Sequence, residues 1–420
     1  MTGEREDQSV GPRKAAALGI SAGCSADLST SADPSAARST GFLVALSCLP
    51  GVGPATLLRC QDGDGPEAAW AAVVAGQPKR SGDLAEAVAR LSASAVADLV
   101  RTARAIEPVD ELRRHQVGGQ RVLVRGTPGY PGRLVHDPAP PAMLFAHGNL
   151  EPLGGPTVAV VGTRNATRPG RDFAMELGAG LAEAGVAVVS GLALGIDGAA
   201  HRGALRAKAG GAVGAPVGVI ASGLDVAYPR RHTELHRAVA GCGLLVSETP
   251  LGHRPTAWRF PARNRIIAGL ADAVVVVESR SAGGSMLTVK EALDRGVTVL
   301  AVPGHPSAPA AAGTNDLLFD GAGIVRSVDD VLGVIGVQPP RRPEPVEPAS
   351  DPALPPHHRA VLAALGDTPA ALPEIVARSG MALDEVSEAL VRLEGSQHLA
   401  RSAGWYERTT PPGAGRRPGR

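Results

Sequence analysis

The sequence predicts an α/β protein with a Rossmann-like core of parallel strands, a small helical module before the core and a winged-helix domain after it. Three patterns carry this prediction. Short apolar, β-prone runs alternate with helical segments over residues 120–335, which is typical of a parallel sheet covered by helices on both faces. Helical spacing alone precedes this region, and a proline-rich stretch with three further helical patterns follows it.

The N-terminal part divides into an extension and a helical module. The first 40 residues are rich in Ser, Ala, Gly and Asp without helical or strand periodicity, so we expect them to be disordered. Residues 41–110 carry apolar side chains three and four apart, which indicates a helical module of the SAM or helix-hairpin-helix type. The turn Leu49–Pro54 contains glycines that would let backbone N–H groups approach a phosphate. Because no basic residue follows it directly, a purely structural hairpin is the favoured interpretation.

Six short apolar runs define the predicted core. Near-continuous apolar strands that alternate with helices are buried on both faces, as in parallel sheets. The runs are Val158–Val161, Val186–Val189, Val217–Ile220, Leu244–Val246, Ala273–Val277 and Val297–Val302.

The C-terminal region begins after a stretch too rich in proline for packed structure, which predicts a linker. Three helical patterns and a β-prone end then give the outline of a winged helix. Its third helix carries Asp384, Glu385 and Glu388, and such an acidic helix would read DNA poorly, so a protein-interaction or accessory role is favoured. The predicted boundaries are 1–40 for the extension, 41–110 for the helical module, 120–335 for the core, 336–355 for the linker, 356–409 for the winged helix and 410–420 for a disordered tail.

Composition limits the ligands that this chain can hold. The net charge is only +1, so binding of a polyanion requires locally concentrated positive charge. Aromatic residues make up 3% of the chain, so any platform for stacking must be small. Cys24, Cys48, Cys60 and Cys242 lie far apart without zinc-site spacing, so no disulfide framework, metal or other cofactor is expected. No apolar run is long enough for a membrane helix, which favours a soluble cytoplasmic protein.

The candidate binding loops follow the predicted strands, because ligands of open α/β sheets sit at the carboxyl ends of the strands. The first strand ends in Gly162-Thr163-Arg164-Asn165, which is not the GxGxxG that a dinucleotide requires. The second ends in Ser190-Gly191 and continues to Gly195 before the next helix. Two adjacent helix N-termini preceded by glycines would suit an extended polyanion as well as a mononucleotide.

Arginines accompany these loops. Arg230 follows Tyr228-Pro229, and Arg263-Asn264-Arg265 is expected where a helix begins. Cations at a helix N-terminus oppose the helix dipole, which suggests a functional purpose. Any single arginine could instead pair with Glu248 or Asp272. The set Arg164, Arg230, Arg263 and Arg265, expected at one edge of the sheet, favours a phosphate site.

These motifs together resemble the core of the DNA-processing protein A (DprA/Smf) family in order and spacing, over about residues 120–330. The matching segments are Gly162-Thr163-Arg164, Ser190-Gly191-x-Ala193-x-Gly195-Ile196-Asp197, Gly223-Leu224-Asp225-x-x-Tyr228-Pro229, Ser247-Glu248, Phe260-Pro261-x-Arg263-Asn264-Arg265-Ile266-Ile267-Ala268-Gly269, Gly284-Ser285-x-x-Thr288 and Val302-Pro303-Gly304.

The resemblance implies a protein without catalytic activity that binds and protects single-stranded DNA with little sequence preference. It further implies that the protein forms a homodimer and loads the recombinase RecA in natural transformation and recombination. The residues expected to contact DNA are Gly162, Arg164, Ser190, Gly191, Gly195, Arg230, Arg263, Asn264, Arg265, Gly284, Ser285 and Thr288.

Two other classes of function remain as alternatives. LOG-like nucleotide phosphoribohydrolases use a similar core with a Pro-Gly-Gly-x-Gly-Thr loop and a catalytic Glu. Here Gly283–Glu291 is a partial match without the Pro and the third Gly, which leaves no acid placed for hydrolysis. A transcription regulator would depend on the winged helix alone, and its acidic third helix argues against that class.

Overall fold

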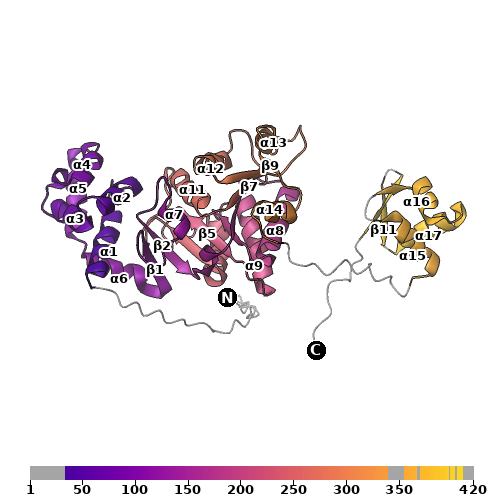
Figure 1. Ribbon diagram of the computed structural model, residues 1–420, viewed down its shortest axis with the longest axis horizontal. Coiled ribbons are helices and arrows are strands. Elements are labelled where there is room, and N and C mark those ends of the chain that lie inside the picture. The colour runs from indigo at the N-terminus through magenta and orange to yellow at the C-terminus, as the bar shows by residue number, and fades with distance from the viewer. Residues whose placement is uncertain (1–33, 339–353, 367–368, 397, 403, 410–420) are drawn as a thin grey trace, which may run out of the picture. The chain divides into compact units, whose positions relative to one another are not determined.

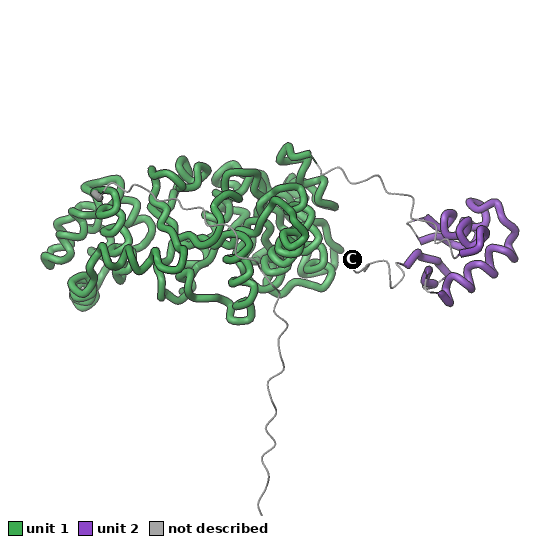
Figure 2. The backbone as a smooth tube through the Cα atoms, turned by 90° about the horizontal axis from the view of Figure 1, so that it is seen from below, with its two compact units in different colours: residues 1–338 green, residues 339–420 purple. Residues whose placement is uncertain are grey.

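The computed structural model describes residues 34–338, 354–366, 369–396, 398–402 and 404–409. The chain divides into two compact units, residues 1–338 and 339–420 (Figure 2). None of the helices in the described ranges is long and apolar enough to cross a membrane. Residues 1–33 and 410–420, part of the expected disordered ends, and most of the predicted linker lie outside these ranges.

The first unit begins with a layer of helices, as the sequence predicts (Figure 1). The expected extension to residue 40 is wrong at its end, because helix α1 already begins at Pro34 and is held by the buried side chains of Leu43 and Leu46. Proline occupies the first turn of three of the other helices, where its missing N–H costs no hydrogen bond. The helices are α1 (Pro34–Ser47), α2 (Pro54–Asp62), α3 (Pro66–Val74), α4 (Gly82–Ala89), α5 (Ala93–Arg104) and α6 (Pro108–Gln116).

A nine-stranded sheet follows, in the order β1-β2-β6-β5-β4-β3-β7-β8-β9. In this order, all neighbouring strands from β6 through β5, β4, β3, β7 and β8 to β9 pair in parallel. This confirms the predicted Rossmann-like sheet and its six strands. The sequence analysis missed β1 and β2, which add an antiparallel hairpin beside β6, and the two-residue β9. The strands are β1 (Gln120–Val124), β2 (Met143–Gly148), β3 (Thr157–Val161), β4 (Ala187–Ser190), β5 (Pro216–Ile220), β6 (Leu244–Ser247), β7 (Ala273–Val276), β8 (Thr298–Ala301) and β9 (Gly323–Ile324).

Helices cover both faces of the sheet, and successive strand residues face opposite layers. Val158 and Val160 of β3 pack in one cluster with α8, α9 and α14, whereas Ala159 and Val161 pack in another with α11 and α12. The core helices are α7 (Gly132–Val135), α8 (Arg168–Glu183), α9 (Ile196–Ala209), α10 (Thr233–Cys242), α11 (Arg259–Gly269), α12 (Gly284–Leu293), α13 (Ala312–Phe319) and α14 (Val328–Val334).

Two helices of this core approach unusually closely. A Cβ on Gly203 of α9 would lie 1.9 Å from the carbonyl oxygen of Met175 on α8, and one on Gly178 of α8 would lie 2.2 Å from that of Ala200. Only glycine allows this approach at the two positions. It brings α8 and α9, and therefore the loops that precede them, side by side.

The helical layer packs directly on the sheet. Leu43 and Leu46 of α1 belong to the same buried cluster as Met143 and Phe145 of β2. The ring of His115, at the end of α6, lies 4.8 Å from that of Phe145. The helical layer and the sheet therefore share one hydrophobic core.

The second unit has the helices and hairpin of a winged helix, as predicted. Helices α15 (Pro356–Leu365), α16 (Leu372–Ser379) and α17 (Leu383–Gly395) enclose a small core with β10 (Ala370–Ala371), β11 (Leu399–Ser402) and β12 (Trp405–Arg408). The strands pair antiparallel in the order β10-β12-β11.

Candidate functional site

The candidate site lies where the strand order of the sheet reverses. From β3 the chain builds β4, β5 and β6 on one side and then crosses to β7 on the other. The loops after β3 and β7 therefore diverge and leave a crevice at the carboxyl ends of the strands, where open α/β sheets bind their ligands.

The crevice contains a hollow of about 590 Å³, which we name the core hollow. Its walls come from the loop after β3, the N-terminal half of α11 and the start of α12. Seven of the predicted site residues line it, namely Gly162, Arg164, Arg263, Asn264, Gly284, Ser285 and Thr288.

A smaller hollow of about 60 Å³ adjoins the core hollow, and we name it the aromatic hollow. Arg164, Phe260 and Arg263 line both hollows. The rings of Tyr228 and Phe260 lie 5.5 Å apart, and the guanidinium carbon of Arg164 lies 5.2 Å from the centre of the Phe260 ring. A cation and two rings thus meet at one place, although the chain as a whole is poor in aromatic residues.

Arg263 is buried within the site and bonds two of its backbone segments. Its side chain is buried, and its Nη1 donates to the carbonyl oxygens of Gly191, 2.7 Å away, and of Val219. The buried carboxylate of Asp197 accepts from the backbone N–H of Gly191 at 3.1 Å and of Ala193 at 3.4 Å. These bonds fix the loop between β4 and α9 from two sides.

Burial and mutual attraction act on this pair in opposite directions. Burial lowers the pKa of Arg263 to about 10, although the nearby Asp197 favours its charged form. Burial likewise raises the pKa of Asp197, and Arg263 partly offsets that rise. Arg263 therefore stays protonated at neutral pH. Among the described residues its Nε has no hydrogen-bond partner, so the guanidinium retains a free donor.

Glycines shape the loop that carries this network. A Cβ on Gly191 would lie 2.2 Å from Nη1 of Arg263, so only glycine leaves room for that guanidinium. Gly195 has a φ of +79°, and a Cβ there would lie 2.2 Å from the carbonyl oxygen of Thr163. Ser190 is fully buried and donates to the carbonyl oxygen of Val160 at 2.6 Å. Gly191 lines the aromatic hollow, whereas Ser190 and Gly195 line neither hollow and support the loop.

The structure does not bring Arg265 to either hollow. Its guanidinium donates to both carboxylate oxygens of Glu248, at 2.5 and 2.6 Å, and to the carbonyl oxygen of Ala139. Arg263 and Arg265 are two positions apart on a helix, about 200° around its axis, so they face opposite sides. Arg265 therefore forms the salt bridge with Glu248 that the sequence left open as an alternative. Asp272, the other acid considered, pairs with Arg133.

The expected helix start at Arg263 is also wrong. Helix α11 begins at Arg259, so Arg263 lies in its second turn, and the argument from the helix dipole does not apply to it. Arg230 is exposed in a short turn directly after Tyr228 and Pro229, which line the aromatic hollow, but Arg230 itself lines neither hollow.

The start of α12 supplies the second wall of the core hollow. Ser285 and Thr288 are buried there, and the hydroxyl of Ser285 donates to that of Ser279 at 2.8 Å. The first turn of this ten-residue helix contains no acidic residue, so its N-terminus keeps a positive dipole end toward the hollow. Together with Arg164, Arg263 and Arg280, this end makes the hollow favourable for anions.

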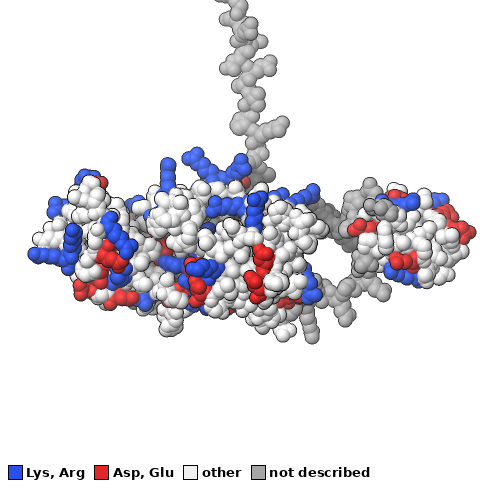
Figure 3. All heavy atoms as spheres, turned by 90° about the horizontal axis from the view of Figure 1, so that it is seen from above, with Lys and Arg blue, Asp and Glu red and all other residues white. Residues whose placement is uncertain are grey.

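Sequence analysis did not assign Phe260 to the site, although the signal was present. Phe260, Arg263 and Asn264 are spaced three and four apart, and such residues share one face of a helix. Basic and acidic side chains are interspersed on the face that is uppermost in Figure 1 (Figure 3). The positive charge of the site is thus a local feature.

One group of side chains has the composition of a metal site. Cys48, Glu111 and His115 place their potential ligand atoms within 4.8 Å of one another. However, Nδ1 of His115 bonds the carbonyl oxygen of Glu111 at 2.9 Å, and its Nε2 accepts from the N–H of Leu251 at 2.9 Å. Burial raises the pKa of Cys48 to about 12, so its thiol keeps its proton. These residues form a hydrogen-bond network between the helical layer and the sheet.

A parallel sheet whose switch point opens into an arginine-lined crevice defines an α/β protein with a site suited to anionic ligands. Residues 121–336 match the model of the DNA recombination-mediator protein A family, and residues 345–404 match that of the DprA winged helix domain. The chain belongs to the DprA/Smf family of DNA-processing proteins.

Relatives support this assignment over most of the chain. The chain is 31% identical to Protein Smf of Synechocystis over 390 residues, which cover 84% of this chain and 94% of that protein. It is 35% identical to Protein Smf of Escherichia coli over 286 residues, 66% of this chain and 75% of that one. Among solved structures, DNA processing protein A of Streptococcus pneumoniae matches with a TM-score of 0.57 and 31% identity, over 70% of this chain and 97% of that chain.

Proposed function

We propose that this protein binds single-stranded DNA through the core and aromatic hollows and acts as a recombination mediator without catalytic activity. The observation that carries the proposal is the convergence of Arg164, Arg263 and the Tyr228–Phe260 ring pair on two adjoining hollows. Cations for phosphates and rings for bases are the usual components of sites that bind single strands.

The depth of the site favours a single strand over a duplex. Arg263 and Asn264, which line the core hollow, are each only 8% exposed. Bases in a duplex are paired and stacked, so a nucleotide that reaches these side chains must come from an unpaired strand. Arginines that hold phosphates and rings that stack on bases can act on any base, which fits binding with little sequence preference.

The same lining argues against the alternative of a nucleotide hydrolase. Among the described residues that line the two hollows, Asp197 is the only one with a carboxylate, and its Oδ2 accepts from the backbone N–H groups of Gly191 and Ala193. Glu291, the acid at the end of the partial motif match Gly283–Glu291, accepts from Nη1 of Arg295 at 2.5 Å and lines neither hollow. Release of free base from nucleoside monophosphates, abolished by Glu291→Ala, would overturn this part of the proposal.

The direct test is the replacement of Arg164 by Ala, with binding to a fluorescent oligothymidylate followed by anisotropy at several salt concentrations. We expect weaker binding and a salt slope lower by about 0.7 for each lost phosphate contact. Arg206→Ala is the matched control, because Arg206 is an exposed arginine near the C-terminal end of α9, away from the strand ends that form the site. Equal binding by the Arg164 variant, the control and the unchanged protein would refute the proposed site.

Self-association and transfer of DNA to RecA complete the proposed function. Phe319 is 93% exposed at the end of α13, and Ile324 is 48% exposed on β9, the last strand of the sheet. An edge strand with exposed apolar side chains supports a homodimer formed through this edge. Phe319→Glu should then shift the protein to monomers in sedimentation experiments. Transfer of DNA to RecA is tested by measuring whether the protein stimulates RecA assembly on single-stranded DNA. A role of this kind would be carried out in the cytoplasm.

The winged helix supports an accessory role in this proposal. Its third helix, α17, uses some of its acidic residues for its own structure, because a carboxylate oxygen of Glu385 accepts from the N–H of Ala382 and Glu388 pairs with Arg392 at 3.5 Å. Negative charge at the start of this helix would repel a DNA backbone, which favours a protein as its partner.

A further inference from the structure

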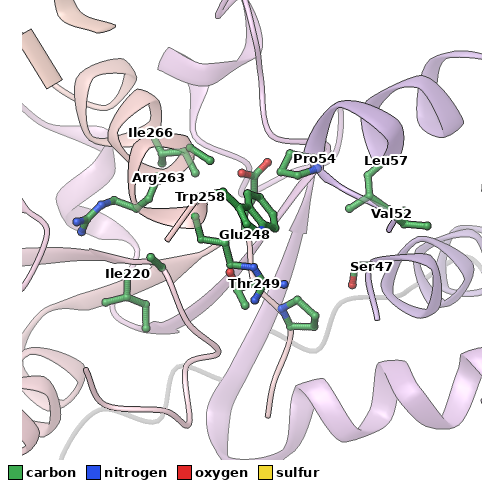
Figure 4. Close-up of a pocket in the computed structure, with 14 residues that line it drawn as sticks. Ser47, Val52, Pro54, Leu57, Ile220, Glu248, Thr249, Trp258, Arg263 and Ile266 are labelled. Atoms are coloured by element: carbon green, nitrogen blue, oxygen red, sulfur yellow. The ribbon is translucent and has the colours of Figure 1, made fainter. Parts of the chain in front are cut away.

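A second region of hollows continues from the site toward the helical layer. The aromatic hollow shares Ile220, Ala221 and Arg263 with a narrow hollow of about 30 Å³, the bridging hollow, which lies between α11 and the turn after α1 (Figure 4). The bridging hollow in turn shares Trp258 and Arg259 with a larger one of about 690 Å³, the turn hollow. A continuous series of hollows therefore leads past the start of α11.

Trp258 and Arg259 have the properties of a binding site at the centre of this series. Trp258 is 53% exposed, although an aromatic side chain of this size normally buries most of its surface, and Figure 4 places it between α11 and Pro54 of α2. The guanidinium carbon of Arg259 lies 5.2 Å from the Trp258 ring. Among the described residues, the buried Nη1 of Arg259 has no hydrogen-bond partner.

The walls of the turn hollow carry no compensating negative charge. Its described lining comprises the turn of residues 47–53 together with Thr102, His253, Trp258 and Arg259, and includes no carboxylate. Gly51 adopts a φ of +82° in this turn, and a Cβ on Gly53 would meet no atom within 4 Å, so the backbone at Gly53 is open to a ligand. A free guanidinium donor, an exposed indole and a bare backbone suit an anionic ligand that carries flat rings.

We infer that the turn hollow is a second subsite for single-stranded DNA, in which a base stacks on Trp258 and a phosphate is held by Arg259. This inference rests on the function proposed above and extends the path of the strand. Phe260 faces the aromatic hollow, whereas Trp258, two residues earlier, faces the turn hollow. A strand that crosses the start of α11 would meet one ring on each side of it. The turn at Leu49–Pro54, for which the sequence favoured a structural hairpin, becomes one wall of a binding site.

The test compares a short oligothymidylate of about 5 nucleotides with a long one of about 20, bound to the full-length protein. The short oligomer can fill the core and aromatic hollows, and the long one can also reach the turn hollow. Trp258→Ala should weaken binding of the long oligomer by about 5- to 150-fold, as expected for loss of one stacked base, and leave the short oligomer unaffected. Arg259→Gln should lower the salt slope for the long oligomer by about 0.7.

Tryptophan fluorescence gives an independent readout. In a Trp405→Phe background two tryptophans remain, Trp70, which is 6% exposed, and Trp258. The long oligomer should quench the exposed indole, and additional replacement of Trp258 by Phe should abolish most of the quenching. The Trp258 variants are first compared with the unchanged protein by circular dichroism, which should show the same fold.

The outcomes separate the two proposals. If the unchanged protein binds neither oligomer, the proposed function is wrong. If it binds both while Trp258→Ala and Arg259→Gln alter neither affinity, the second subsite is refuted and the first stands. Equal weakening of both oligomers by these variants would also refute it, because Trp258 would then act only through the first site.

Discussion

Replacement of Arg263 by Ala tests whether the proposed site is built around a buried ion. The substitution removes the donor to the carbonyl oxygens of Gly191 and Val219 and leaves Asp197 as a buried charge without its neighbouring cation. Loss of one partner of a buried pair typically costs about 3–5 kcal/mol. We expect a decrease of this size in the free energy of unfolding, measured by urea denaturation followed by circular dichroism. Arg164→Ala, at an exposed position, should change it by less than about 0.5 kcal/mol.

The pH dependence of the variant's stability tests more specifically whether Arg263 stabilises the ionised form of Asp197. Loss of Arg263 should raise the pKa of Asp197 further, so the folded variant takes up a proton at a pH where the unfolded chain does not. The destabilisation should therefore shrink as the pH falls from about 7 toward about 4. Adding Asp197→Asn should restore part of the stability at neutral pH. An Arg263→Ala protein with an unchanged urea midpoint at both pH values would refute this account of the loop.

Three further predictions concern stability. Burial lowers the pKa of His201 to about 4, so as the pH falls the unfolded chain takes up the His201 proton before the folded chain does. About 3 kcal/mol of the free energy of unfolding should therefore be lost between about pH 6.5 and 4. A His201→Gln variant with the same pH profile of stability would contradict this. Glu248→Gln leaves the guanidinium of Arg265, which is 12% exposed, without its ionised partner, so we expect a lower urea midpoint, and an unchanged midpoint would count against the pair. Gly203→Ala should lower the melting temperature, because its Cβ would overlap the carbonyl of Met175 and force the helices apart at a cost of at least about 1–3 kcal/mol; retention of the melting temperature would show that they can move apart freely.

The parallel core could be predicted because buried strands leave a strong sequence signal. The runs from Val158 to Val302 are almost wholly apolar, and tertiary structure confirms each of them as a strand. Strand β1 was missed because it is only partly buried and its sequence, Gln120–Val124, mixes polar and apolar residues. Strand β2 begins with the buried apolar run Met143–Ala146, so its signal was present and was not assigned. The early start of α1 escaped for a related reason, since its first residues are Ser- and Ala-rich and the packing of Leu43 and Leu46 holds the helix.

The directions of the side chains decide which of the predicted site residues line the hollows and which do not. The sequence indicated which loops meet at one edge of the sheet, because the carboxyl ends of parallel strands lie there. It did not tell where α11 begins, and so it treated Arg263 and Arg265 as one cluster. Helical periodicity alone would have separated them and grouped Phe260 with Arg263. The turn hollow could not be predicted, since it exists only where the helical layer packs on the sheet through contacts distant in sequence.

The single hydrophobic core that joins the helical layer to the sheet also has a thermodynamic consequence. Because Leu43 and Phe145 are buried in one cluster, the two walls of the bridging hollow are fixed relative to each other before any ligand arrives. A preorganised surface loses little conformational entropy on association, so the flexible strand would bear most of that cost. Weakening this shared core, for example by Phe145→Ala, should therefore weaken binding of a long strand, even though Phe145 lines none of the four hollows described above.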